Sequence, residues 1–113
     1  MIIGRTVILK EEVPSTNDAA KLLAAEGAEE GTVIVAKRQT AGKGRLGRHW
    51  SSPDGGVYLS VILRPKITAG EMLRLTVMFG IPVAEAIREM TNMQATLKWP
   101  NDIIVEGRKV GGI

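Results

Sequence analysis

A short run of branched apolar residues, GTVIVAK at Gly31–Lys37, is typical of a buried β-strand. Similar runs occur at Arg5–Val13 and at Gly55–Pro65, where a proline closes the segment. Between the first two runs, the cap-type residues Ser15–Asn17 and the terminating glycine Gly27 indicate a helix. The first half of the chain is therefore predicted to alternate strand, helix, strand, loop and strand.

The second half begins with a helical pattern. Apolar residues recur every three or four positions through Thr68–Thr91, and Pro82 within this stretch is predicted to kink the helix or split it near Ile81. A strand at Ala95–Trp99, a turn and a hairpin at Ile103–Ile113 follow.

Length and composition limit the class of protein. The 113 residues suit one domain, and 44% hydrophobic with 24% charged residues is an ordinary folded composition. The absence of cysteine excludes disulfides and thiolate zinc sites, and a single histidine, His49, excludes a multi-histidine metal site. No apolar run approaches the roughly 20 residues of a membrane helix, and the N-terminus is charged too early for a secretory signal. We therefore expect a cytoplasmic protein without a membrane partner.

The positive charge is concentrated in one glycine-rich loop, QTAGKGRLGRHW at Gln39–Trp50. Five of the 15 Lys and Arg residues lie between Lys37 and Trp50, with no acidic residue among them. This pattern favours a small anionic ligand over duplex DNA, because charges elsewhere are mixed. A solvated basic loop and a nucleic-acid-binding module remain alternatives. The loop runs to Pro53, a length typical of functional or mobile segments, and we expect it to be mobile without ligand.

The same loop matches the G-x-G-x-x-G pattern of dinucleotide-binding folds from Gly42 to Gly47. That motif needs a helix directly after the glycines, and the residues that follow have turn composition. Glycines allow a close backbone approach, and Lys43, Arg45 and Arg48 would neutralise phosphate or carboxylate. Trp50 offers a flat face for a base. The loop is therefore predicted to bind a nucleotide through its phosphate and ring.

Four motifs together resemble biotin protein ligases in order and spacing. They are STN at Ser15–Asn17, the glycine-rich loop, KWPND at Lys98–Asp102 and KVGGI at Lys109–Ile113. The resemblance implies an α+β fold with a mixed β-sheet flanked by helices, related to class II aminoacyl-tRNA synthetases. It also implies a biotin–[acetyl-CoA-carboxylase] ligase, which forms biotinyl-5′-AMP from biotin and ATP and transfers biotin to a lysine of a biotin carboxyl carrier protein. Mg²⁺ would arrive with ATP, and no metal ligands are expected from the protein.

The resemblance also implies a set of site residues. Those expected to bind biotin are Ser15, Thr16, Asn17, Gln39, Gly42, Lys43, Gly44, Arg45 and Lys109. Those expected to bind the nucleotide are Arg45, Arg48, Trp50 and Asn101, and those expected to act in catalysis are Lys109, Arg45 and Asp102. Family members commonly carry arginine where this chain has Lys43, which keeps the charge and loses the bidentate fork.

Family members also continue well past the KVGGI motif. We therefore expect residues 1–113 to be the N-terminal portion of one catalytic domain, without a DNA-binding domain or a C-terminal β domain. A non-catalytic biotin-binding fragment stays open as an alternative, as does a homodimer.

Overall fold

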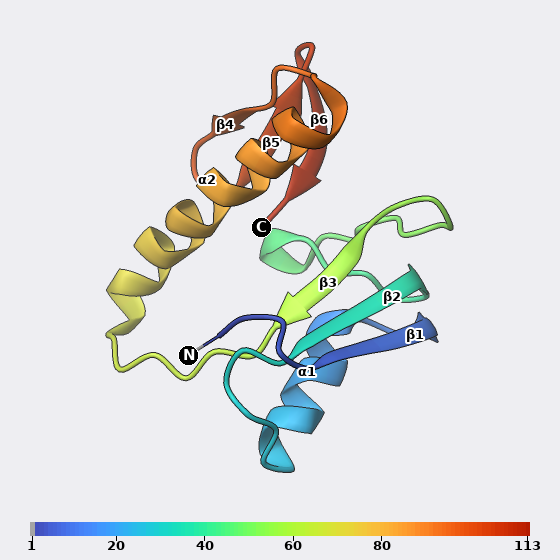
Figure 1. Cartoon of the computed structure of the whole chain (residues 1–113), viewed down its shortest axis with the longest axis vertical. Helices are drawn as coiled ribbons and strands as arrows, with labels where there is room; N and C mark the ends of the chain where they lie inside the picture. The colour runs from blue at the N-terminus through green and yellow to red at the C-terminus, as the bar shows by residue number, and fades with distance from the viewer. Residues whose placement is uncertain (1) are drawn as a thin grey trace. The chain divides into compact units, whose positions relative to one another are not determined.

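Residues 2–113 are described by a computed structural model, in which the chain divides into two units, Met1–Pro65 and Lys66–Ile113. Each unit carries its own three-stranded sheet and its own helix (Figure 1). The prediction of one domain over 1–113 stays a prediction, since two such units can belong to one domain.

The first unit is a strand–helix–strand motif extended by a third strand. Its elements are β1 (Val7–Val13), α1 (Thr16–Ala25), β2 (Val33–Gln39), a short 3₁₀ helix η1 (Arg45–Gly47) and β3 (Tyr58–Val61). The sheet order is β1-β2-β3, with β1 parallel to β2 and β2 antiparallel to β3. This mixed sheet with a helix on one face confirms the predicted fold class.

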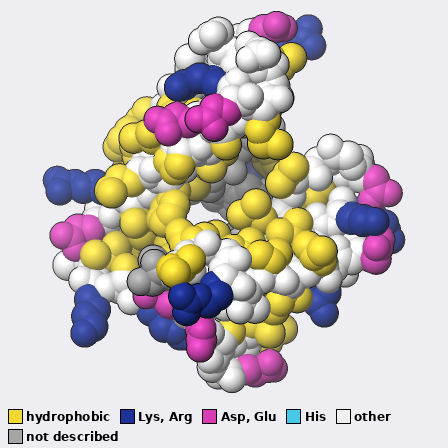
Figure 2. All heavy atoms as spheres, viewed as in Figure 1, with side chains coloured by type: hydrophobic (Ala, Val, Ile, Leu, Met, Phe, Trp, Pro, Cys, Tyr) yellow, Lys and Arg dark blue, Asp and Glu magenta, His cyan; other side chains and the backbone are white. Residues whose placement is uncertain are grey.

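Alternation along the strands decides which face of this sheet the helix covers. Ile34 on β2 is fully buried and packs with Ala20 of α1 and with Ile62, which directly follows β3. Leu9 and Leu59 lie opposite each other across β2, on the face away from this cluster, and are 75% and 50% exposed. Such exposed apolar side chains are widespread on the face of the molecule shown in Figure 2.

The second unit packs one long helix against an antiparallel sheet. Its elements are the 3₁₀ helix η2 (Ala69–Glu71), α2 (Met72–Thr91), β4 (Thr96–Lys98), β5 (Asp102–Val105) and β6 (Arg108–Gly112). The strand order is β4-β5-β6, with both pairs antiparallel, and the core comprises Ala84, Ala95, Ile103 and Val105.

Helix α2 differs from its prediction at Pro82. The helix runs without a break from Met72 to Thr91, so the prediction of a split near Ile81 is wrong, and the alternative of a kink there stays a prediction. The hydrophobic pattern continues across the proline, and burial of Gly80 and Ala84 on either side keeps the helix together. A Cβ atom at Gly80 would lie 3.1 Å from Cδ2 of Leu97 on β4, a tight contact that the Leu97 side chain would have to relieve by shifting.

The remaining elements follow their predictions with shorter bounds. β3 covers only the middle of the predicted segment 55–65, and the turn before β5 occupies 99–101. The hairpin of β5 and β6 turns at Glu106–Gly107, both with positive φ. Within residues 2–113, no helix is long and apolar enough to cross a membrane.

Candidate functional site

The carboxyl ends of two parallel strands bring the first predicted residues together. β1 ends at Val13 and β2 ends at Gln39, and these two residues are partners in the parallel register. Ser15–Asn17 follow β1 directly, and the glycine-rich loop follows β2. Because ligands of open α/β sheets bind outside the carboxyl ends of the strands, this edge is the candidate site of the first unit.

The side chain of Gln39 connects the start of α1 to the loop. Its Oε1 accepts a hydrogen bond from the Thr16 backbone N–H at 2.7 Å, and its Nε2 donates to Oγ of Ser52 at 2.9 Å. Ser52 in turn donates to the backbone carbonyl of Trp50 at 2.9 Å. Gln39 is half-buried and Ser52 is buried, so these bonds fix the amide of Gln39 at the edge of the site.

A second buried contact fixes the first turn of α1 to β3. The Ser60 hydroxyl donates to Oδ1 of Asn17 at 2.6 Å and lies 2.8 Å from Oγ1 of Thr16. Ser15 occupies the N-cap position with extended backbone angles, and within residues 2–113 its side chain makes no capping hydrogen bond. The side chains of Ser15, Thr16 and Ser60 are all buried. The STN motif therefore does more than cap a helix, because two of its side chains bond to a strand 43 and 44 residues away.

Backbone hydrogen bonds connect the two sides of the glycine-rich loop at its base. The backbone N–H of Trp50 donates to the Gly42 carbonyl at 2.9 Å, and Lys43 and His49 form an isolated β-bridge. Gly44 N–H donates to Arg48 O at 2.7 Å, which closes the tip around η1. The loop is thus a narrow hairpin with a 3₁₀ turn. As predicted, no α-helix directly follows Gly47 in the described chain, where the next element is the strand β3, and this rules out the dinucleotide fingerprint.

Gly42 is a position where only glycine fits. It is buried, and a Cβ atom there would meet the Trp50 carbonyl oxygen directly and would lie 2.5 Å from Oγ of Ser52 and 3.0 Å from Nε2 of Gln39. The close approach brings the loop backbone against the polar network described above. The packing of the loop base therefore depends on the absence of a side chain at Gly42.

The cations of the loop have different surroundings. Lys43 Nζ lies 2.9 Å from both carboxylate oxygens of Asp18, which stands in the first turn of α1. Arg45 and Arg48 are exposed at the tip and form no ion pair with any part of the chain between residues 2 and 113. Trp50 is half-buried at the base. Two arginines are therefore available at the tip for an anion.

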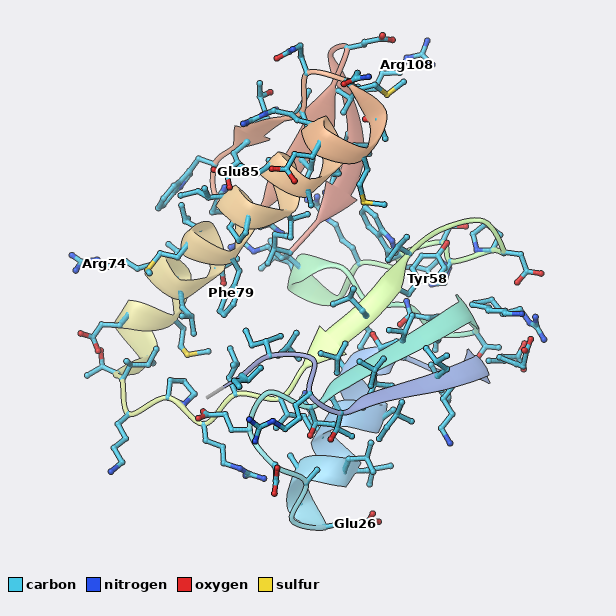
Figure 3. All side chains as sticks on the ribbon, in the orientation of Figure 1. Glu26, Tyr58, Arg74, Phe79, Glu85 and Arg108 are labelled. Carbon is cyan, nitrogen blue, oxygen red and sulfur yellow. The ribbon has the colours of Figure 1, made fainter. Side chains whose placement is uncertain are left out.

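Arg38 supports the loop from β2. Its guanidinium bonds to Glu12 on β1 at 3.1 Å and to Asp54, beyond the loop, at 3.3 Å. These hydrogen bonds, that to Glu12 first, raise the pKa of Arg38 above its ordinary value. Nearby, the Tyr58 hydroxyl donates to the Pro53 carbonyl at 2.7 Å, and Figure 3 shows Tyr58 on β3. Both contacts fix the end of the loop to the sheet.

The predicted residues of the second unit form a group of their own. Lys109 on β6 forms an ion pair of 2.9 Å with Asp102 on β5, and Asp102 is the less exposed partner. Asn101 precedes Asp102 and bonds through both its carbonyl oxygen and its side-chain amide to the backbone of Ile113. The strand pairing of the β5–β6 hairpin thus brings together the acid, the amide and the lysine that sequence reasoning selected.

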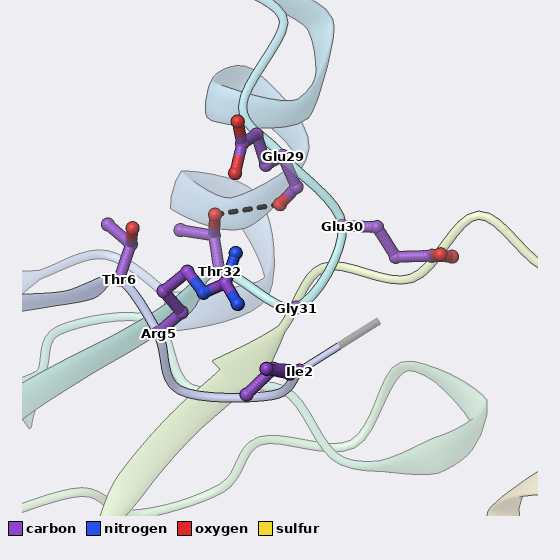
Figure 4. Close-up of a pocket in the computed structure, with 7 residues that line it drawn as sticks. All are labelled: Ile2, Arg5, Thr6, Glu29, Glu30, Gly31 and Thr32. Atoms are coloured by element: carbon purple, nitrogen blue, oxygen red, sulfur yellow. Dashed lines mark hydrogen bonds between the residues drawn. The ribbon is translucent and has the colours of Figure 1, made fainter.

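The described residues also line two hollows. One, of about 160 Å³, lies at the amino ends of β1 and β2, beyond Thr6 and Thr32, where the Thr32 hydroxyl donates to the Glu29 carbonyl at 2.7 Å (Figure 4). It is at the opposite end of the strands from the candidate site. The other, of about 190 Å³, lies in the second unit between α2 and the KWPND turn, and Asn101 is among its lining residues. Between residues 2 and 113, no group of three His, Cys, Asp or Glu side chains suits a metal ion.

Comparison with known proteins decides the family. The model of the biotin/lipoate A/B protein ligase family matches residues 9–113. The chain belongs to this family. The ligase relatives include the bifunctional ligase/repressor BirA of Bacillus subtilis, which is 42% identical over 99% of this chain and 35% of that protein. The biotin–[acetyl-CoA-carboxylase] ligase of Paracoccus denitrificans is 36% identical over 88% of this chain and 42% of that protein.

Solved ligase structures match the fold. The biotin protein ligase from Aquifex aeolicus in complex with biotin and ATP gives a TM-score of 0.83 at 42% identity, covering 96% of this chain and 45% of that one. The Leishmania major ligase in complex with biotinyl-5-AMP gives 0.79 at 30% identity, covering 96% and 50%. The resemblance drawn from the four motifs is thus confirmed. The chain spans about 35 to 50% of the length of these ligases.

Sequence reasoning missed three polar residues of this ligase family member. Ser52 and Ser60 are buried members of the network around Gln39 and Thr16, and Asp18 is the partner of Lys43. Ser60 could have been suspected, because it is a lone polar residue inside an apolar strand and its neighbours Leu59 and Val61 face the other side of the sheet. Asp18 directly follows the STN motif, but nothing in its local sequence indicates its pairing.

Proposed function

We propose that this chain binds biotin and ATP as part of a biotin–[carrier protein] ligase and takes part in forming biotinyl-5′-AMP. The observation that carries the proposal is the hydrogen-bonded network of Thr16, Gln39 and Ser52 beside a loop with cations at its tip. A neutral polar head and a negative charge can bind side by side there. Relatives solved with biotin, ATP or biotinyl-5-AMP support the same ligands for this chain.

In the proposed reaction, biotin binds with its ring head at the start of α1. Ser15, Thr16, Asn17 and Gln39 supply donors and acceptors on a rigid frame, because bonds from β3 and from Ser52 hold three of these four side chains. A polar site whose groups are already oriented loses little entropy when the ligand binds. This part of the site selects the ligand by the positions of its hydrogen-bonding groups.

The first chemical step joins two anions. A carboxylate oxygen of biotin attacks the α-phosphorus of ATP, the bond from that phosphorus to the bridging oxygen breaks, and pyrophosphate leaves with the electron pair. The protein contributes position and positive charge, since no covalent nucleophile is required. We assign the carboxylate and α-phosphate to the backbone of Gly42 and Gly44 and to Lys43 and Arg45. For Lys109, in the second unit, we propose the biotin-binding and catalytic role that the resemblance implies.

The nucleotide is assigned to the remaining residues. Trp50 would pack on adenine, and Arg48 and Asn101 would contact the phosphates and ribose. Asp102 would hold Lys109, to which it is already paired at 2.9 Å. ATP would bind as its Mg²⁺ complex, with the metal carried on the phosphates.

The second step uses a carrier protein. The side-chain amine of a carrier lysine attacks the biotinyl carbonyl, AMP leaves, and the amine loses a proton as the amide forms. We propose a biotin carboxyl carrier protein as this partner and the cytoplasm as the location.

The proposal is tested in two stages with the purified chain. Isotope exchange between labelled pyrophosphate and ATP, dependent on biotin and Mg²⁺, measures the first step without a carrier. Incorporation of labelled biotin into a carrier domain measures both steps. Biotin binding without either activity would identify a binding fragment, and absence of biotin binding together with salt-sensitive oligonucleotide binding would replace the proposal by a nucleic-acid module.

A further inference from the structure

Asp18 is not among the residues assigned to the ligands above, yet its side chain forms an ion pair with Lys43, which is one of them. Both oxygens of the Asp18 carboxylate accept hydrogen bonds from Lys43 Nζ, each at 2.9 Å. The two side chains are 39% and 55% exposed, so the pair is at the surface and accessible to a ligand. Of the three cations between Gly42 and Trp50, Lys43 is the one whose ion pair the structure describes within residues 2–113.

Asp18 occupies a fixed position that suits a negative charge. It lies in the first turn of α1, where the unpaired N–H groups and the helix dipole favour a negative charge. The same turn carries Thr16 and Asn17, which are bonded to Gln39 and Ser60. Asp18 therefore stands on a fixed frame, whereas Lys43 stands on a loop whose tip is exposed.

An incoming anion must compete with Asp18 for Lys43. A lysine ammonium has three N–H donors, and two of them point at the Asp18 oxygens. A phosphate or carboxylate placed on the third donor would stand within a few ångströms of the Asp18 carboxylate, and like charges at that distance repel. Binding is favoured when Lys43 leaves Asp18 for the ligand.

We infer that Asp18 is a positioning residue: it holds Lys43, and with it the glycine-rich loop, against the start of α1 in the free protein, and it gives Lys43 up to the anionic group of the ligand. This inference rests on the proposed function for the identity of that anion. The anion we commit to is the phosphate chain of ATP.

The test compares Asp18→Asn with a charge-matched control. Glu11→Gln removes one negative charge from another surface ion pair, the more exposed pair of Glu11 with Lys37 at 3.2 Å, between β1 and β2. Both variants change the net charge equally, so a general effect of charge on anion binding cancels. Asp18→Glu serves as the conservative variant that should restore the wild-type behaviour.

Two measurements are made on each protein. Hydrogen exchange of the amides between Gly42 and Trp50, without ligand, should be about two- to fivefold faster in Asp18→Asn, the range expected for loss of a surface ion pair. Calorimetric titration with MgATP should show affinity about two- to fivefold higher in the same variant. Glu11→Gln and Asp18→Glu should resemble the wild type in both.

The two measurements separate this inference from the proposed function. Unchanged loop exchange in Asp18→Asn, or exchange equally accelerated in Glu11→Gln, overturns the role of Asp18 whatever the chain binds. Weaker binding of MgATP by Asp18→Asn also overturns it, since that result would mean that the Asp18 carboxylate favours ATP binding and does not compete with ATP for Lys43. If the wild type binds neither ATP nor biotin, the proposed function fails and the anion exchange fails with it. Faster loop exchange in that case still supports the hold on Lys43.

Discussion

Gly42→Ala is the substitution for which the structure gives the sharpest expectation. The added methyl group would enter space already held by the Trp50 carbonyl oxygen and by Oγ of Ser52 at 2.5 Å. Both atoms are backbone or buried, so neither can turn away into solvent. The base of the loop must move instead, and the bond between Trp50 N–H and the Gly42 carbonyl at 2.9 Å moves with it.

The expected cost follows from two contributions. Forcing a methyl group into packed space usually costs about 1–3 kcal/mol. Each hydrogen bond broken in the network adds about 0.5–1.5 kcal/mol. We therefore expect the free energy of unfolding to fall by about 1.5–4.5 kcal/mol, with the loop base and the Gln39 side chain displaced together.

The assay is urea unfolding combined with hydrogen exchange at two amides. Trp50 N–H reports on the loop base, and Thr16 N–H reports on the Gln39 side chain, to which it donates at 2.7 Å. Gly44→Ala is the matched control in the same loop, because the nearest atom to its added Cβ, Cβ of Arg48, is at 3.5 Å. Equal losses in the two variants, or acceleration at Trp50 without any at Thr16, would refute the argument that Gly42 supports the network.

Three further predictions concern other parts of the chain. Ser60→Ala should lower the free energy of unfolding by about 1–3 kcal/mol in a urea titration, because it leaves the Asn17 side-chain oxygen without its donor. Substitution of the exposed Ser51 by alanine is the control, and a similar loss of stability in both variants would contradict a structural role for the Ser60 hydroxyl. Lys109→Ala should change the melting temperature little, since a surface ion pair is worth about 0–1 kcal/mol, while pyrophosphate exchange collapses; the reverse pattern would make the lysine structural. Pro82→Ala should raise stability by about 1–3 kcal/mol, because it restores a backbone donor inside an unbroken helix, and a lower melting temperature would show that the proline ring is needed for packing.

Local patterns predicted the elements of this fold well. The branched apolar runs became β1, β2 and β3, and the cap residues and glycine around α1 bounded a helix of Thr16–Ala25. The error at Pro82 has a simple reason. A local rule assigns a proline the cost of a lost hydrogen bond, but burial of Gly80 and Ala84 on either side stabilises the helix more than the proline destabilises it.

The candidate site was predictable as a set of motifs but not as a network. The bonds of Ser60 to Thr16 and Asn17 join segments 43 and 44 residues apart, and the pairing of Lys43 with Asp18 spans 25 residues. Such contacts depend on strand register and on the path of the loop, which no short sequence pattern encodes. The roles of individual residues toward biotin and ATP stay predictions.

The hydrogen bonds that link Thr16, Gln39, Ser52 and Trp50 all have the same direction from donor to acceptor. A backbone N–H, which can only donate, stands at the Thr16 end, and a carbonyl, which can only accept, stands at the Trp50 end. The amide of Gln39 and the hydroxyl of Ser52 lie between them and could each point either way in isolation. A flipped amide would set two donors against each other at Thr16, so the two ends fix the direction of every bond between them. The backbone groups of Thr16 and Trp50 thus decide which amide hydrogen and which lone pair Gln39 has left to offer a ligand. A ligand with its donor and acceptor exchanged would meet a mismatched amide that cannot turn over without breaking these bonds.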